Sequence, residues 1–331
     1  MQLARRAVGA DLMPGPANRQ PLRPWTHTGP AAYAPHAGFI APALGTPGLR
    51  PVILAFILIE SLYGLAQNGF GWLLETLAPE LADAYSYGDT AAGMLVQLFS
   101  FTLLGLTVVM VVERTHGRGF FSLTGPPMTG LRQFRAVFWP LAALFVLLEI
   151  LPPWWSADAL AQVTPPLVWL LLLPLSILAL TIQTGAEELL YRGYLQQQIA
   201  AWDNRPWVWL ILPNILFGLA HLNVSGPFPE NLHYVLWAFC FGLAASDLTA
   251  RSGTLGPALA FHLVNNVYAF LFFGEDGGPD SGLALLLFNS DAVSQPFSDL
   301  MADAPLIPFA LIIEIGLVAL MWLVARLALR R

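Results

Sequence analysis

Long apolar runs separated by short polar segments dominate the pattern of this chain. A hydrophobic stretch of about 18 residues or more with few charges is a candidate membrane-spanning helix. About eight such runs, a few of them marginal in length, cover residues 51–69, 91–112, 136–153, 165–187, 207–223, 232–250, 255–273 and 305–328. The pattern therefore predicts an all-α fold, a polytopic membrane bundle of about eight transmembrane helices.

Residues 1–50 depart from this pattern. They combine eight prolines with several Ala, Gly and Arg residues, and they contain no apolar run long enough for a core. We therefore expect residues 1–50 to form a disordered tail and residues 51–331 to form the membrane domain. The first apolar run starts only after Arg50, which argues against an N-terminal signal peptide.

The amino-acid composition also indicates a membrane protein. Of 331 residues, 56% are hydrophobic and 11% are charged, whereas a soluble domain carries roughly 25% charged residues. The net charge of −6 argues against a nucleic-acid partner. The single cysteine excludes an internal disulfide and a metal site built from cysteines.

The basic residues give an independent prediction of topology. All 15 are Arg, and eight spans with an internal N-terminus place every one of them in a segment on the inner side. Since cytoplasmic loops are enriched in Lys and Arg, we expect both termini to be cytoplasmic. The Arg-only composition is typical of a GC-rich genome and favours a multi-pass protein of a bacterial inner (plasma) membrane.

Three segments bring ionisable or polar groups into predicted spans, where such groups are costly. In the first, Glu187 and Glu188 point about 100° apart on a helix. Glu188 and Arg192 are four residues apart and can pair, which leaves Glu187 free for another partner. The alternative is an ordinary ion pair at a helix end.

The second and third segments each place two residues on one helix face. Phe217 and His221 are four residues apart in the fifth run, and His262 and Asn266 are four apart in the seventh. Taken singly, His221 is more typical of a core histidine, and His262 and Asn266 are more typical of interhelical hydrogen bonds.

The three segments together favour one water-containing cavity, because unpaired polar groups in lipid cost several kcal/mol. Glu187 is suited to take a proton from water, and His221 to position that water or bind a metal. His262 and Asn266 are suited to stabilise an oxyanion. His221 and His262 with a carboxylate also suit a zinc site with one open position, so zinc and a metal-free mechanism both stay open.

The depth of these groups constrains the fold. Glu187 lies near the inner end of the fourth run, whereas His221 lies near the far end of the fifth. We therefore expect the fourth helix to continue to about Gln198, which moves Glu187 towards the middle of the membrane. Glu60, Glu149 and Glu314 lack partners at motif spacing, and we expect them to form interhelical hydrogen bonds or to face a cavity.

The order Glu-Glu-x-x-x-Arg, Phe-x-x-x-His and His-x-x-x-Asn resembles the CPBP family, which includes the type II CAAX prenyl endopeptidases and bacteriocin-processing and immunity proteins. The resemblance covers about residues 140–275, which would form the protease-like core. It implies an eight-helix fold and intramembrane hydrolysis of peptide bonds. The matching positions are Glu187, Glu188, Arg192, Phe217, His221, His262 and Asn266.

The resemblance assigns roles to these positions. It implies Glu187 as the base with His221 as its water partner, and His262 with Asn266 at the oxyanion. Ser246 stands where the family usually has a second small Gly, and it is still small enough for close helix packing. The substrate would be a membrane-associated peptide or protein.

Two other classes of function remain. A non-catalytic scaffold or bacteriocin-immunity factor would keep the fold but lose the motif residues, all of which are present here. A secondary transporter also places Glu and His at mid-membrane, but it should show inverted halves with broken spans at matching places. We find no such symmetry in the sequence.

Overall fold

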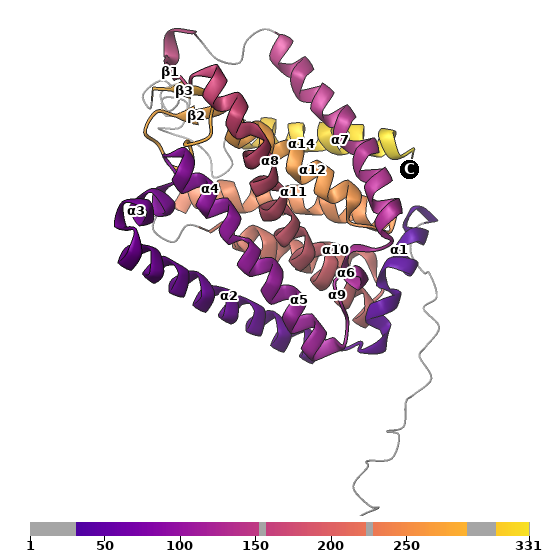
Figure 1. The fold of residues 1–331 in the computed structure, drawn as a ribbon. Coiled ribbons are helices and arrows are strands. Elements are labelled where there is room, and N and C mark those ends of the chain that lie inside the picture. Colours follow the sequence, from indigo (N-terminus) through magenta and orange to yellow (C-terminus); the bar gives the residue numbers. More distant parts are fainter. Residues whose placement is uncertain (1–30, 152–156, 223–227, 290–308, 331) are drawn as a thin grey trace, which may run out of the picture.

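The computed structural model describes residues 31–151, 157–222, 228–289 and 309–330 (Figure 1). Its first half contains η1 (Ala31–Tyr33), α1 (Ala34–Ile40), η2 (Ala41–Gly45), α2 (Leu49–Leu77), α3 (Pro79–Tyr87), α4 (Ala91–Ser100), α5 (Thr102–His116), α6 (Phe121–Thr124) and α7 (Pro127–Ile150). Its second half contains η3 (Ala157–Ala159), β1 (Leu160–Val163), α8 (Pro166–Glu188), η4 (Leu189–Gln196), α9 (Gln197–Trp202), α10 (Pro206–Leu219), α11 (Phe228–Ser252), α12 (Gly256–Leu271), β2 (Phe273–Glu275), β3 (Leu286–Phe288) and α14 (Phe309–Leu329).

The predicted all-α polytopic fold is confirmed. Each of the eight apolar runs coincides with a helix or with a pair of consecutive helices. Within the described residues, six helical stretches are long and apolar enough to cross a membrane: Leu49–Leu77, Ala91–His116, Pro127–Ile150, Pro166–Trp202, Leu232–Ser252 and Phe309–Leu329. The chain is therefore an integral, multi-pass membrane protein. α10 and α12 are shorter, with 14 and 16 residues, so the count of eight spans and the cytoplasmic termini stay predictions.

The helix that carries Glu187 and Glu188 continues well past them, as expected from the depth of the site. α8, η4 and α9 form one helical stretch from Pro166 to Trp202, so the helix extends beyond Gln198. η4 is a π-helix that begins directly after Glu188. Stretches of π-helix recur at functional sites because they shift the register of the side chains that follow.

The stretch ends at a short polar loop. Asp203 accepts hydrogen bonds from the backbone N–H and the Nε of Arg205, at 3.0 and 2.9 Å. These bonds lower the pKa of Asp203. The loop turns the chain into α10, which starts with Pro206 at its first turn, where a missing backbone N–H costs nothing.

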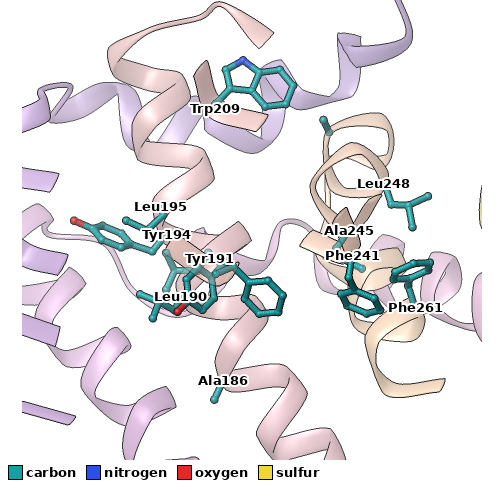
Figure 2. Close-up of a cluster of buried hydrophobic side chains, with 14 of the residues drawn as sticks. Ala186, Leu190, Tyr191, Tyr194, Leu195, Trp209, Phe241, Ala245, Leu248 and Phe261 are labelled. Carbon is teal, nitrogen blue, oxygen red and sulfur yellow. The ribbon is translucent and has the colours of Figure 1, made fainter. Parts of the chain in front are cut away.

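Aromatic and small side chains fill the space between α8–η4, α11 and α12. Figure 2 shows Tyr191 and Tyr194 on the α8–η4 helix and Phe241 facing Phe261. The ring centroids of Phe241 and Phe261 lie 4.7 Å apart, and both side chains are fully buried. Small residues let the helices approach closely at other points. A Cβ atom on Gly256 of α12, for example, would overlap the backbone carbonyl of Gly130 in α7.

Part of the predicted disordered tail is ordered. Residues 1–30 of that tail lie outside the described ranges, but residues 31–50 form η1, α1, η2 and the start of α2. His36, Phe39 and Ile40 are buried, and the ring of His36 lies 4.3 Å from that of Trp209 in α10. The prolines start helical turns here instead of preventing them, and the apolar residues between them bury against the membrane domain.

A small three-stranded sheet lies at one end of the bundle. β3 is central, antiparallel to β1 and parallel to β2. In Figure 1 the sheet lies beside the start of α8, away from α6, α9 and α1 at the other end. It joins the chain segments that precede α8 and follow α12, the two helices that carry most of the candidate site.

Candidate active site

A buried ion pair anchors the candidate site. Arg192 Nη1 donates to Glu188 Oε1 at 2.9 Å, and the two side chains are 0% and 1% exposed. The Nη2 of Arg192 donates to Asn214 Oδ1 of α10 at 3.3 Å. The guanidinium also lies over the ring of Phe217, 4.5 Å from its centroid, which is a cation–π contact. The predicted Glu188–Arg192 pair is thus present, and it is fully desolvated.

His262 of α12 contacts both carboxylates. Its Nδ1 lies 2.9 Å from Glu188 Oε1, and its Nε2 lies 3.5 Å from Glu187 Oε2. Because a carboxylate only accepts, the ionised Glu188 favours a proton on Nδ1 and leaves Nε2 facing Glu187. The rings of Phe217 and Phe241 pack edge-on against the imidazole at 6.2 and 5.1 Å. Glu188 therefore fixes the orientation of His262 towards Glu187.

A second hydrogen-bonded chain leads from Glu187 to Asn266. Gln183 Nε2 donates to Glu187 Oε1 at 2.7 Å, and Asn266 Nδ2 donates to Gln183 Oε1 at 2.9 Å. Gln183 lies one helical turn before Glu187 on α8 and thus bridges α8 and α12. The Oε2 atom of Glu187 is buried and makes no hydrogen bond. One oxygen of Glu187 is therefore held while the other faces His262 without a donor.

His221 lies at the edge of this cluster. It follows the end of α10, is exposed, and its Nδ1 lies 2.8 Å from the carbonyl oxygen of Phe217. A carbonyl oxygen only accepts, so Nδ1 carries the proton and Nε2 is the free basic nitrogen. The ring of Phe217 touches the rings of both His221 and His262. The structure thus brings five predicted residues together and places His221 beside them, with no hydrogen bond or ion pair to Glu187.

The arrangement does not form a three-ligand metal site. Among the described residues, no group of three His, Cys, Asp or Glu side chains lies close enough to hold one ion. Both nitrogens of His262 face carboxylates, and His221 Nδ1 faces a backbone carbonyl.

The remaining intramembrane carboxylates are elsewhere, and most have partners of their own. Glu149 accepts a hydrogen bond from the Tyr268 hydroxyl, and Glu314 lies 2.7 Å from His233 Nε2. These contacts agree with the expectation of interhelical hydrogen bonds. Glu60 is exposed on α2. None of the three joins the site.

Two residues of the site carry no sequence signal that we recognised. Gln183 and Asn214 are both buried, and Asn214 Nδ2 donates to Ser246 Oγ at 2.8 Å while its Oδ1 accepts from Arg192. The hydroxyl at position 246, where the family usually has Gly, is therefore a hydrogen-bond partner for the amide that orients Arg192. In the sequence each amide only interrupts a long apolar run, and its partners on other helices appear only in the structure.

Gly242→Ala should disturb this support. A Cβ atom at Gly242 would overlap Asn214 Oδ1 and lie 3.0 Å from Arg192 Nη2. We expect the variant to lose roughly 1–3 kcal/mol of stability, because an added methyl group in a packed core forces its neighbours to move. The thermal midpoint Tm in detergent measures this, and Gly316→Ala is the matched control because nothing lies within 4 Å of its Cβ position. Equal Tm values for the two variants would show that Asn214 shifts freely and does not hold Arg192.

The part of the chain that contains the candidate site matches a known protein family. Residues 166–268 match the family described as type II CAAX prenyl endopeptidase Rce1-like, and all six candidate catalytic residues fall within that range. The uncharacterized protein YyaK from Bacillus subtilis (strain 168) is 29% identical over 123 residues, which cover 36% of this chain and 39% of that protein. No solved structure matches the chain significantly.

The matched segment runs from the start of α8 through most of α12, and so contains both carboxylates, Arg192, both histidines and Asn266. This is the segment in which the three motifs were recognised. Through it, residues 166–268 match the Rce1-like family of type II CAAX prenyl endopeptidases, in agreement with the resemblance that the motifs indicated.

Proposed function

We propose that this protein is an intramembrane endopeptidase that hydrolyses peptide bonds of a membrane-associated protein or peptide with water activated by Glu187. The observation that carries the proposal is the pair of adjacent carboxylates with different surroundings. Glu188 Oε1 is tied to the Arg192 guanidinium and to His262 Nδ1. Glu187 Oε1 is held by the Gln183 amide, and its Oε2 faces His262 Nε2 at 3.5 Å and no cation. Two neighbouring acids held in unlike environments are typical of acid–base catalysis.

In the proposed mechanism each group has one task. Glu187 Oε2 takes a proton from a water molecule, and the resulting hydroxide attacks the peptide carbonyl. His221 Nε2 positions this water from the edge of the site. His262 Nε2, when it carries a proton, donates to the developing oxyanion together with the Asn266 amide. Glu187 finally returns the proton to the leaving amine.

Glu188 and Arg192 support the reaction without touching the substrate. The Arg192 guanidinium pairs with the buried Glu188 carboxylate, and Glu188 in turn contacts His262 Nδ1, so the pair fixes the imidazole whose Nε2 faces Glu187. Gln183 holds one oxygen of Glu187, which limits rotation of the carboxylate. The substrate would be a segment at the membrane surface. In a bacterium this substrate would be a peptide or an anchored protein, and not a prenylated CAAX protein. The enzyme itself would reside in the inner membrane.

The test is a cleavage assay of the full chain in liposomes with a library of membrane-anchored fluorogenic peptides. Wild type is compared with Glu187→Gln and His221→Ala, and each reaction is run with and without a chelator. Glu314→Gln is the matched control, because it alters a partly exposed carboxylate that pairs with His233 outside the site. We expect wild type and Glu314→Gln to cut, and the two site variants to be inactive while still folded.

Other results would redirect the assignment. If wild type cuts no peptide, or if the site variants match it, the cluster serves structure or binding and the chain acts as a scaffold or immunity factor. If a chelator stops cleavage and added zinc restores it, the metal-free mechanism is wrong, and His221 must move to complete a metal site. Flux of a solute across the liposome without cleavage would favour a transporter.

A further inference from the structure

An apolar groove lies among α10, α11 and α14. On α11 it uses the helix face opposite Gly242, the residue that packs beside Asn214 and Arg192. Its volume is about 360 Å³, within the range of roughly 300–1,000 Å³ typical of small-molecule sites. The wall consists mostly of apolar side chains; its lining residues are Tyr33, Leu210, Cys240, Leu243, Ala244, Asp247, Ile315, Val318, Ala319 and Trp322. No residue of the candidate active site lines it.

Small side chains create the groove. Ala244 on α11 and Ala319 on α14 stand where the helices pack, and Ala319 is exposed while Ala244 is half-buried. Both helices belong to the stretches that can cross a membrane, so the groove between them lies in the membrane-crossing part of the bundle. An apolar hollow at this depth is filled by lipid chains in preference to water.

One end of the groove is polar. Asp247 accepts hydrogen bonds from the Tyr33 hydroxyl at 2.6 Å, Arg251 Nε at 2.7 Å and the Trp322 indole at 2.8 Å. These contacts join the N-terminal segment, α11 and α14 at the end of the groove. The groove follows one face of each of the two helices, and both faces end at this polar end. The lining residues are 240, 243–244 and 247 on α11 and 315, 318–319 and 322 on α14.

Two arginines follow one turn beyond this end. Arg251 lies four residues after Asp247, and Arg326 lies four residues after Trp322, with its guanidinium 4.7 Å from the indole ring. Arg251 also lies over the Tyr33 ring, 5.2 Å from its centroid. The topology predicted from the arginines puts both at the cytoplasmic surface, at the level of lipid headgroups. Asp247, Arg251 and Arg326 together carry a net charge of +1, because Asp247 pairs with Arg251. The groove therefore combines an apolar slot with an end of net positive charge, which is the complement of an anionic amphiphile.

We propose that this groove binds a phospholipid of the cytoplasmic leaflet, with one acyl chain between α11 and α14 and the headgroup phosphate beside the Arg326 guanidinium. The groove runs along two membrane helices, so an acyl chain that lies parallel to these helices fits along its length. The phosphate pairs with guanidinium groups at the interface, where basic residues attract anionic lipids. This site is separate from the carboxylate cluster, and the proposal does not depend on proteolysis.

The test uses defined lipids and two matched pairs of variants. The detergent-purified full chain is supplied with phosphatidylglycerol or phosphatidylcholine, and bound lipid is read by native mass spectrometry. Ala319→Trp fills the groove, whereas Leu320→Trp changes the next residue of α14, which is exposed and does not line it. Arg326→Gln removes one rim charge, whereas Arg330→Gln removes a charge beyond the groove.

We expect wild type and Leu320→Trp to retain phosphatidylglycerol and Ala319→Trp to retain none. Arg326→Gln should bind phosphatidylglycerol about fivefold more weakly, and Arg330→Gln should match wild type. Equal retention by Ala319→Trp and Leu320→Trp would overturn the groove as the site. Equal binding of phosphatidylcholine and phosphatidylglycerol would overturn the role of the arginine rim.

A second measurement guards against misfolded variants. A phosphatidylglycerol with a photoreactive diazirine in its acyl chain is reconstituted with wild-type protein, irradiated, and the labelled residues are mapped. We expect labelling to concentrate on the lining residues of α11 and α14, including Cys240, which is the one cysteine of the chain. Labelling spread evenly over the exposed faces of α2 and α8 would overturn the proposal.

Discussion

Glu187→Gln should lower kcat by about 10²–10⁴-fold, the usual contribution of a general base, and should leave Tm close to that of wild type. The amide keeps the shape of the side chain, and its oxygen still accepts the hydrogen bond from Gln183. It cannot take a proton from water. Rates on the best peptide from the library, measured against substrate concentration in liposomes, separate kcat from KM.

Glu188→Gln is the informative comparison for this prediction. It removes a charge that Arg192 and His262 both contact, so it should lower Tm as well as activity. The two variants should thus differ in stability: Glu187→Gln should lower kcat alone, whereas Glu188→Gln should lower Tm as well. If Glu187→Gln raises KM alone and leaves kcat intact, Glu187 binds substrate and the base must be sought elsewhere.

The parts of the site predictable from sequence are those set by spacing along one helix. Glu188 and Arg192 were expected to pair because they are four residues apart, and the structure places them at 2.9 Å. His262 and Asn266 were expected to share a face, and both contact residues of α8. Helical periodicity needs only local information, so such pairs follow from the chain order alone.

The parts that were not predictable depend on how the helices are placed against one another. Nothing in the local pattern distinguishes Gln183 or Asn214 from any other amide in an apolar run, because their partners come from other helices. The fifth run was expected to span 207–223, but α10 ends at Leu219, which leaves His221 at the rim. Residues 31–45 are ordered because some of them are buried against helices that lie far away in the sequence. Such contacts cannot be inferred from amino-acid composition.

The Glu188–Arg192 pair carries its own large prediction, because four groups depend on it. Arg192 bonds Glu188 and Asn214 and lies over Phe217, and its partner Glu188 orients the imidazole of His262. Both charges are completely removed from solvent, so neither can be hydrated if the other is lost. Removal of one partner of such a pair is far more costly than removal of both.

Arg192→Met should therefore cost roughly 3–5 kcal/mol in the free energy of unfolding, because it leaves the buried Glu188 carboxylate without its cation. Glu188→Met should cost a similar amount for the opposite reason. The double variant Glu188→Met, Arg192→Met should recover much of the loss, since two apolar side chains of similar size leave no buried charge. Unfolding by SDS in mixed micelles gives all three values, and the coupling energy follows from the cycle. Additive losses in the double variant would mean that each charge has another partner, and that the pair is not the electrostatic anchor of the site.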